Sequence, residues 1–176
     1  PFVLESGQLT WPLADFAQMV LNDEELKPQD AGDGRTLSEV ALGYVTAAEE
    51  SLGFHHQRWH TDDVSIDGES IKIGWFSAQA DADFLEGISP GSVLPVNHQT
   101  SMGRTVAALY AATGDDSHED RAQRIARWVA LELKLHHGGS YVWHYWPKMS
   151  YYEGFVDNSG NDNIEDFGHA TVTIQF

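Results

Sequence analysis

The chain has 176 residues, no cysteine and a formal net charge of −17 at pH 7. Its length is enough to bury a substantial core, and we expect a single domain over residues 1–176 with no apolar run long enough to span a membrane. The absence of cysteine excludes disulfides and thiolate chemistry, and the negative charge argues against nucleic acid or an anionic membrane as a partner.

The first third of the chain carries the signals of two helices. Thr10 is a candidate N-cap, with Pro12 in the first turn of the helix that follows. A polar loop over residues 22–35 separates it from the capping box at residues 36–39, Thr-Leu-Ser-Glu, and Gly53 is expected to close the second helix. The inward faces are predicted to hold Leu13, Phe16, Ala17 and Val20 in the first helix and Leu37, Val40, Ala41, Tyr44, Val45, Ala48 and Leu52 in the second.

Residues 54–96 do not continue the helical pattern. A period-two pattern surrounds Asp67-Gly68, which predicts a small β-hairpin near residues 64–76. The rest of this stretch is polar and contains Gly and Pro. We therefore expect a hairpin within an excursion from a helical domain.

Helical patterns return at Asn97. This residue is a candidate N-cap of a helix to Thr113, and Ser117 is a candidate N-cap of a helix that ends at residues 136–139. The short turn at Gly114 predicts an antiparallel helical hairpin. The apolar faces are predicted to be Met102, Val106, Leu109, Tyr110 and Thr113, and then Ala122, Ile125, Ala126, Val129 and Leu133. With a further helix near Asn163, the fold class is mainly α.

The last third combines aromatic, imidazole and carboxylate side chains in two motifs, at residues 141–147 and 165–169. An extended backbone would place Tyr141, Trp143 and Tyr145 on one face, and His144 and Trp146 on the other. Such a wall stacks on sugar rings and hydrogen-bonds to their hydroxyl groups, so we expect a carbohydrate ligand. The alternative for Trp143 is a half-buried aromatic strand.

A second motif gives a candidate general base. On a helix, Glu165 lies four residues and Asp166 three residues before His169, so both carboxylates can reach the imidazole. A carboxylate-oriented histidine is a frequent general base. The alternative is a structural ion pair at the start of a helix.

These motifs have an order found in (α/α)-toroid carbohydrate enzymes. They are Leu94-Pro-Val-Asn-His98, Gly103-Arg104, Leu109-Tyr110, Thr113-Gly-Asp115, Trp143-His-Tyr145 and Glu165-Asp-Phe-Gly-His169. From Trp11 to the end the chain resembles polysaccharide lyases that act on uronate polymers such as alginate or glucuronan. The resemblance implies helical hairpins of an incomplete toroid, because a complete ring needs roughly six or seven hairpins. The chain is then expected to be a fragment, or to need a second chain that completes the ring.

The resemblance also implies a chemistry, which is β-elimination next to a uronate. Matched position by position, Asn97, His98 and Arg104 would neutralise the uronate carboxylate, and His169 would act as base or acid together with Tyr145 or His144. The remaining matched side chains would contact substrate: Tyr141, Trp143, Trp146, Glu165 and Asp166.

The helix predicted after residue 97 bears on these roles. Asn97, Ser101, Arg104 and Ala108 would share a polar face, opposite the apolar stripe, that admits a ligand. The alternatives are a plain N-cap for Asn97 and an ion pair with a surface carboxylate for Arg104.

Several further expectations complete the sequence-based hypothesis. No phosphate-binding glycine loop or nucleophile elbow is present, so we expect no required cofactor and no metal. A divalent cation, such as calcium at the oxygen-rich residues 157–163 or an ion held by Glu165, His169 and His144, is the alternative. The expected partner is an acidic polysaccharide or oligosaccharide, and the expected location is secreted or periplasmic.

Two other functions stay open. One is a glycoside hydrolase on a similar toroid that uses Glu165 or Asp166 in a carboxylate pair. The other is a non-catalytic glycan-binding or structural helical module. An acidic chain that binds an acidic glycan also needs a local neutralising patch, and the sequence does not identify one.

Overall fold

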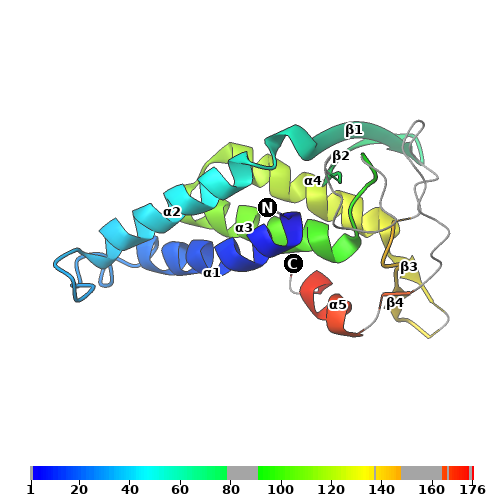
Figure 1. Ribbon diagram of the computed structural model, residues 1–176. Coiled ribbons are helices and arrows are strands. Elements are labelled where there is room, and N and C mark those ends of the chain that lie inside the picture. The colour runs from blue at the N-terminus through cyan, green and yellow to red at the C-terminus, as the bar shows by residue number, and fades with distance from the viewer. Residues whose placement is uncertain (1, 79–90, 137, 148–163, 166, 175) are drawn as a thin grey trace. The chain divides into compact units, whose positions relative to one another are not determined.

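The computed structural model describes residues 2–78, 91–136, 138–147, 164–165, 167–174 and 176. In this part of the chain the protein is mainly helical, with two small two-stranded antiparallel sheets, as predicted for the fold class (Figure 1). These residues do not show a toroid. The helices are α1 (Val3–Leu21), α2 (Leu37–Gly53), α3 (Val96–Thr113), α4 (Asp116–Glu132) and α5 (Phe167–Thr173), with a 3-10 turn at His56–Arg58. The strands are β1 (Trp59–Ile66), β2 (Glu69–Phe76), β3 (Lys134–Leu135) and β4 (Tyr141–Val142).

The chain forms two compact units. The first contains Pro1–His56 and Ser101–Ala122, and the second contains Gln57–Thr100 and Gln123–Phe176. Helices α3 and α4 therefore contribute residues to both units, whereas α1 and α2 belong to the first and both sheets to the second. None of the helices in the described ranges combines the length and apolar character needed to cross a membrane.

Helix α1 begins earlier than predicted, at Val3, so the N-cap prediction for Thr10 is wrong. Thr10 lies inside the helix, where its hydroxyl donates a hydrogen bond to the Ser6 carbonyl at 2.6 Å. Pro12 is likewise an interior residue of the helix and not part of its first turn. A threonine hydroxyl can bond to the preceding turn as well as cap a helix, and the sequence did not separate these two roles.

Glycine and hydroxyl side chains join α1 to α3 in the first unit. A Cβ added at Gly7 would lie only 2.5 Å from the carbonyl carbon of Ser101, so the two backbones touch there. Ser101 donates to the Leu4 carbonyl at 2.9 Å, and Thr105 donates to the Gly7 carbonyl at 3.1 Å. The Thr105 hydroxyl also lies 3.0 Å from that of Thr10. We call Gly7, Thr10, Ser101 and Thr105 the α1–α3 seam.

Helix α2 confirms the predicted capping box. The Thr36 hydroxyl accepts a hydrogen bond from the Glu39 backbone at 3.2 Å, and the Glu39 carboxylate accepts one from the Thr36 backbone at 2.7 Å. The helix ends at Gly53, as predicted. Helices α1 and α2 lie side by side (Figure 1). Ala41, Val45, Ala48 and Leu52 are buried as predicted, whereas Leu37 and Val40 are half-buried and Tyr44 is exposed.

The predicted hairpin is present in the second unit and is longer than expected. β1 and β2 pair in register around a turn in which Asp67 and Gly68 have φ values of 52° and 85°, typical of a type I′ turn. At its far end, the Gln99 amide hydrogen-bonds to both the N–H and the C=O of Phe76, each at 2.7 Å. This buried side chain fixes the first turn of α3 onto the end of β2.

The predicted boundaries of α3 and α4 need correction. α3 begins at Val96, so Asn97 lies in its first turn and is not its N-cap. α4 begins at Asp116, and its first turn is capped by Asp115, whose carboxylate accepts a hydrogen bond from the Ser117 backbone at 2.8 Å. α4 also ends at Glu132 because Lys134 and Leu135 pair with β4 instead.

The core faces of α3 and α4 follow the prediction in part. Met102, Val106 and Leu109 are buried on α3, and Ile125 and Val129 on α4, but Ala126 is exposed. Trp128, which the sequence did not assign to the core, is fully buried.

Candidate functional site

The aromatic segment at residues 141–147 is held in the second unit by backbone contacts. Its first two residues form β4, which pairs with β3. Further along, the Val96 N–H at the start of α3 donates to the Tyr145 carbonyl at 3.2 Å, and His144 forms an isolated bridge with Ile164. The extended strand predicted to Trp146 is therefore only two residues long. Tyr145 is nevertheless fixed beside the first turn of α3.

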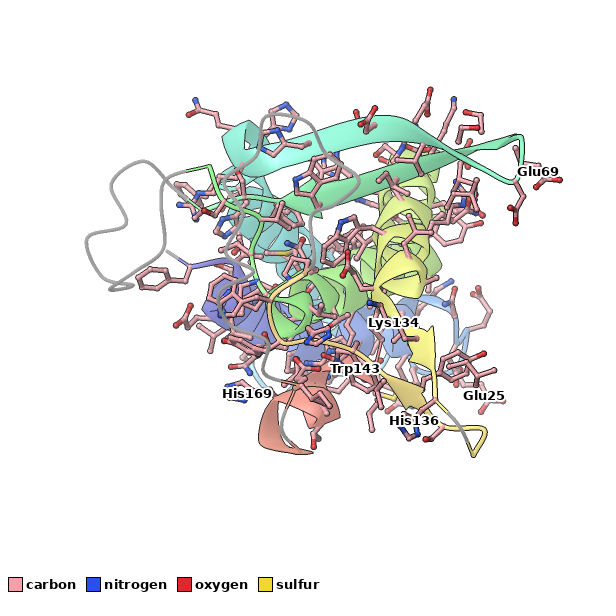
Figure 2. All side chains as sticks on the ribbon, turned by 90° about the vertical axis from the view of Figure 1, so that its right-hand side faces the viewer. Glu25, Glu69, Lys134, His136, Trp143 and His169 are labelled. Atoms are coloured by element: carbon pink, nitrogen blue, oxygen red, sulfur yellow. The ribbon has the colours of Figure 1, made fainter. Side chains whose placement is uncertain are left out.

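Glu165 joins this segment to α5. It lies before α5, so the predicted helical spacing between Glu165 and His169 is wrong. Its buried carboxylate accepts hydrogen bonds from the Trp143 indole N–H and from the Thr173 hydroxyl, the latter at 2.8 Å. Its backbone N–H donates to the Trp143 carbonyl at 3.1 Å. Glu165 thus links Trp143 to α5, the helix that carries His169; Trp143 and His169 are both labelled in Figure 2.

The rings of Tyr145 and His169, which the sequence analysis named together as a candidate acid-base pair, are in contact. Their ring centres are 4.8 Å apart with an interplanar angle of 62°, which is an edge-on contact. On another side, Tyr145 meets Trp146 edge-on at 5.5 Å. Tyr145 is half-buried, whereas His169 is exposed. The structure therefore presents an imidazole to solvent beside a phenol ring.

His98 is the third member of this group, on the first turn of α3. It is 7% exposed, and burial is the main cause that lowers its pKa to about 4. The positive charge that His169 can carry lowers the pKa of His98 further, so these two imidazoles are neighbours. At neutral pH His98 is therefore uncharged. We call Tyr145, His169 and His98 the histidine–tyrosine cluster.

Asn97 lies next to His98 and has a free polar atom. The residue is 1% exposed, and its Oδ1 atom has no hydrogen-bond partner among the described residues. Leaving a buried amide oxygen unpaired costs about 1–3 kcal/mol. Ser92 Oγ and Trp128 Nε1 are likewise buried without a partner among the described residues, so what distinguishes Asn97 is its place beside His98. Asn97 is therefore a candidate contact for a bound group.

The other predicted site residues have different surroundings. Arg104 belongs to the first unit, where its guanidinium lies 4.4 Å from the centre of the Trp11 ring. It is 7% exposed, and burial lowers its pKa. Ser101 and Ala108 are also buried, so the polar face predicted to admit a ligand is packed at these positions.

Three further aromatic or imidazole side chains of the predicted site differ in their exposure to solvent. Tyr141 is 60% exposed, and Trp146 is half-buried. His144 is half-buried, and its Nδ1 atom has no partner within the described part of the chain. Asp166, predicted to orient His169, lies outside the described residues.

Sequence reasoning missed Thr173 and the backbone of Val96. Thr173 follows His169 by four residues, a spacing that places both on one side of a helix, so this signal was present. The bond from Val96 to the Tyr145 carbonyl joins residues far apart in the chain and leaves no pattern in the sequence.

Among the described residues, no three His, Asp or Glu side chains are placed as a group of metal ligands. The calcium candidate at residues 157–163 lies outside the described ranges, so it stays a prediction.

These observations define a mainly helical protein in which the start of α3, the segment after β4 and α5 bring two imidazoles and a phenol together. Compared with protein-family models, curated proteins and solved structures, the chain gives no significant match.

Proposed function

We propose that the histidine–tyrosine cluster is the acid-base centre of a polysaccharide lyase that cleaves a uronic-acid-containing glycan by β-elimination. The observation that carries this proposal is the edge-on contact, at 4.8 Å, between the Tyr145 ring and the exposed His169 ring. An imidazole changes its protonation readily near neutral pH, and a phenol donates and accepts protons through its hydroxyl. The pair thus offers two proton-transfer groups to one ligand.

In the proposed reaction His169 is the base. It takes the proton from C5 of the uronate, and the electron pair of that C–H bond forms the C4–C5 double bond. The C4–O bond breaks at the same time, and the Tyr145 hydroxyl donates a proton to the leaving oxygen. The products are an unsaturated sugar end and a free hydroxyl, with no water consumed.

The uronate carboxylate must be neutralised for its C5 proton to become acidic. The Asn97 Nδ2 group and the His98 imidazole, adjacent on the first turn of α3, are the groups proposed to do this, because both can donate a hydrogen bond to the carboxylate. The unpaired Asn97 Oδ1 is an acceptor and would face a hydroxyl group of the sugar. Because the pKa of His98 is lowered to about 4, it would donate a hydrogen bond as a neutral imidazole and would not supply a charge. A hydrogen bond to the carboxylate draws charge from it without adding a cation near His169.

The hydrolase alternative is less well supported. It requires Glu165 or Asp166 to exchange protons with substrate. The Glu165 carboxylate already accepts hydrogen bonds from Trp143 and Thr173, and it is 7% exposed. Both features favour a fixed structural role for Glu165.

The finer fold belongs to the same proposal. The pairing of α1 with α2 and the short turn between α3 and α4 are consistent with successive helical hairpins of an (α/α) toroid. A second chain would then supply missing hairpins. Substrate would be an acidic polysaccharide or oligosaccharide met in a secreted or periplasmic location.

The test is to incubate the purified chain with alginate, glucuronan and heparosan-like polymers and to follow ultraviolet absorbance from the new double bond. The wild-type protein should produce absorbance on one polymer, and His169→Ala should abolish it without abolishing binding of that polymer. The matched control is His56→Ala, which removes an exposed histidine outside the cluster. Unchanged turnover in His169→Ala would refute the assigned role of His169.

A further inference from the structure

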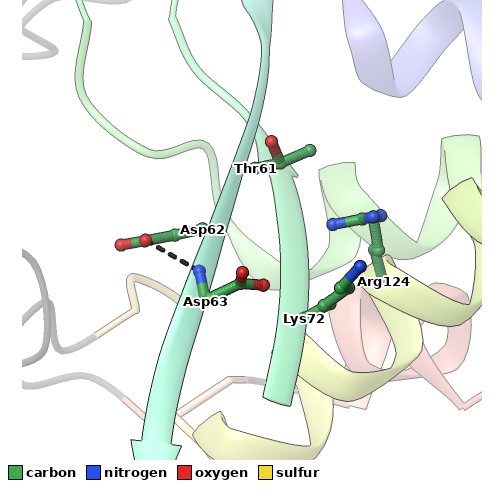
Figure 3. A pocket seen from close by; sticks show the side chains of 5 residues that line it. All are labelled: Thr61, Asp62, Asp63, Lys72 and Arg124. Atoms are coloured by element: carbon green, nitrogen blue, oxygen red, sulfur yellow. Dashed lines mark hydrogen bonds between the residues drawn. The ribbon is translucent and has the colours of Figure 1, made fainter. Parts of the chain in front are cut away.

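A polar pocket in the second unit is separate from the histidine–tyrosine cluster in its lining residues. It has a volume of about 280 Å³ and is formed by the hairpin and α4. Its lining consists of Thr61, Asp62 and Asp63 from β1, Lys72 from β2 and Arg124 from α4 (Figure 3).

The hairpin register explains why these side chains meet. Asp63 is paired with Lys72, and Thr61 is paired with Gly74, so all four positions share one face of the hairpin. A Cβ added at Gly74 would lie 3.2 Å from the Cβ of Arg124, which places α4 directly against this face. Arg127 of α4 also donates a long hydrogen bond, at 3.5 Å, to the Lys72 carbonyl. The pocket is therefore built on two elements in mutual contact.

Two charged side chains of the pocket, Asp63 and Lys72, do not neutralise each other. Asp63 and Lys72 face each other across the strands, yet no ion pair joins them. The one hydrogen bond drawn between the lining residues runs from the Asp63 backbone N–H to the Asp62 carboxylate, at 2.7 Å (Figure 3). Within the described chain, the Lys72 ammonium and the Asp63 carboxylate thus remain available to a bound molecule.

This mixture of charges selects a ligand class. Lys72 and Arg124 favour a negative group, and arginine suits a carboxylate in particular. Asp63 accepts hydrogen bonds from hydroxyl groups but repels a ligand that carries only negative charge. The side chain of its neighbour Asp62 points to the other side of the strand (Figure 3). A ligand with one carboxylate and several hydroxyl groups satisfies Lys72, Arg124 and Asp63 at once.

We infer that this pocket is a secondary subsite for a carboxylate-bearing sugar, in which Lys72 and Arg124 bind the carboxylate while Asp63 binds a hydroxyl group. The inference rests on the proposed function, since it assigns an acidic sugar as the substrate class. It also places two cationic side chains in one pocket of a protein with 27 acidic and 10 basic residues, where the carboxylate of an acidic glycan can bind.

The experiment measures binding of tetramannuronate to the whole chain by calorimetry and by backbone amide NMR shifts, with cellotetraose as the uncharged probe. Tetramannuronate should shift the amides of Thr61, Asp63 and Lys72, and cellotetraose should not. Lys72→Gln should weaken binding about tenfold, the effect of losing one charge-assisted hydrogen bond. Lys72→Arg should restore it.

Lys27→Gln is the matched control, because Lys27 is a lysine of the first unit paired with Glu24. Equal losses in Lys72→Gln and Lys27→Gln, equal shifts with cellotetraose, or no binding of tetramannuronate by the wild type would each overturn the inference. Binding that depends on Lys72 without cleavage of any uronate polymer would uphold the subsite and refute the lyase proposal. The two failures are therefore distinguishable.

Discussion

The α1–α3 seam and the histidine–tyrosine cluster both bring polar side chains to helices, but they use them differently. In the seam, the hydroxyls of Thr10, Ser101 and Thr105 all donate to or contact nearby groups of α1 and α3. Beside the cluster, Asn97 Oδ1 has no partner among the described residues, and the His169 ring is exposed. The polar groups of the seam are satisfied within the protein, whereas Asn97 Oδ1 and the exposed His169 ring could contact the ligand that we propose.

The largest effect is expected from the cluster. Tyr145→Phe keeps the ring that contacts His169 and Trp146 but removes the hydroxyl that we assign as the acid. Loss of a general acid should lower the cleavage rate by at least about 100-fold. The rate is measured by absorbance on the active polymer, with Tyr44→Phe, a change on α2, as the control. A similar loss of cleavage rate in both variants would contradict the role that we assign to the Tyr145 hydroxyl.

The second effect is the pH dependence of stability that His98 confers. Its folded-state pKa of about 4 lies below the ordinary 6.5, so the unfolded chain binds more protons between these values. The contribution of neutral His98 to the free energy of unfolding is complete above pH 6.5. It decreases by about 3 kcal/mol as the pH falls towards 4. Urea unfolding of wild type and His98→Gln across this range isolates the contribution. A difference that does not vary with pH would contradict the buried, neutral state of His98.

The third effect tests the seam. Gly7→Ala places a methyl group against the Ser101 backbone, which should lower the free energy of unfolding by about 2 kcal/mol through overpacking. Gly43→Ala is the matched control, because nothing lies within 4 Å of a Cβ added there. That control should stabilise α2 by up to about 1 kcal/mol. If both substitutions stabilise, the close contact between α1 and α3 is wrong.

The smallest effect concerns the link between α5 and Glu165. Thr173→Val removes a hydrogen-bond donor to the buried Glu165 carboxylate and should destabilise the protein by about 1.5 kcal/mol. It should also change the NMR chemical shifts of the His169 ring, since α5 carries both residues. Thr173→Ser keeps the donor and should behave as the wild type. Unaltered chemical shifts of the His169 ring in Thr173→Val would show that this bond does not position the imidazole.

Local patterns allowed much of the fold to be predicted from the sequence. The capping box at Thr36 and the turn at Asp67-Gly68 each specify a conformation within a few residues, and both are confirmed. Thr10 and Asn97 were misassigned as N-caps because the same side chains also serve inside helices. Local sequence does not reveal which partner a distant segment will offer.

The motifs named residues of the candidate site, but they did not reveal the contacts that join those residues in the structure. The motifs placed Tyr145 and His169 in one hypothesis, and the structure brings their rings together. The role of Glu165 could not be predicted, because its partner Trp143 lies in a separate segment. Arg104 was assigned from a motif, whereas its contact with Trp11 depends on how α1 and α3 pack.

The most direct test of the account is the mass of the oligosaccharides released from a uronate polymer by the wild-type chain. Elimination at the histidine–tyrosine cluster predicts fragments with an unsaturated end and no added water, even when the reaction is run in isotopically labelled water. Fragments that have each gained one labelled water would show hydrolysis and contradict the assigned chemistry.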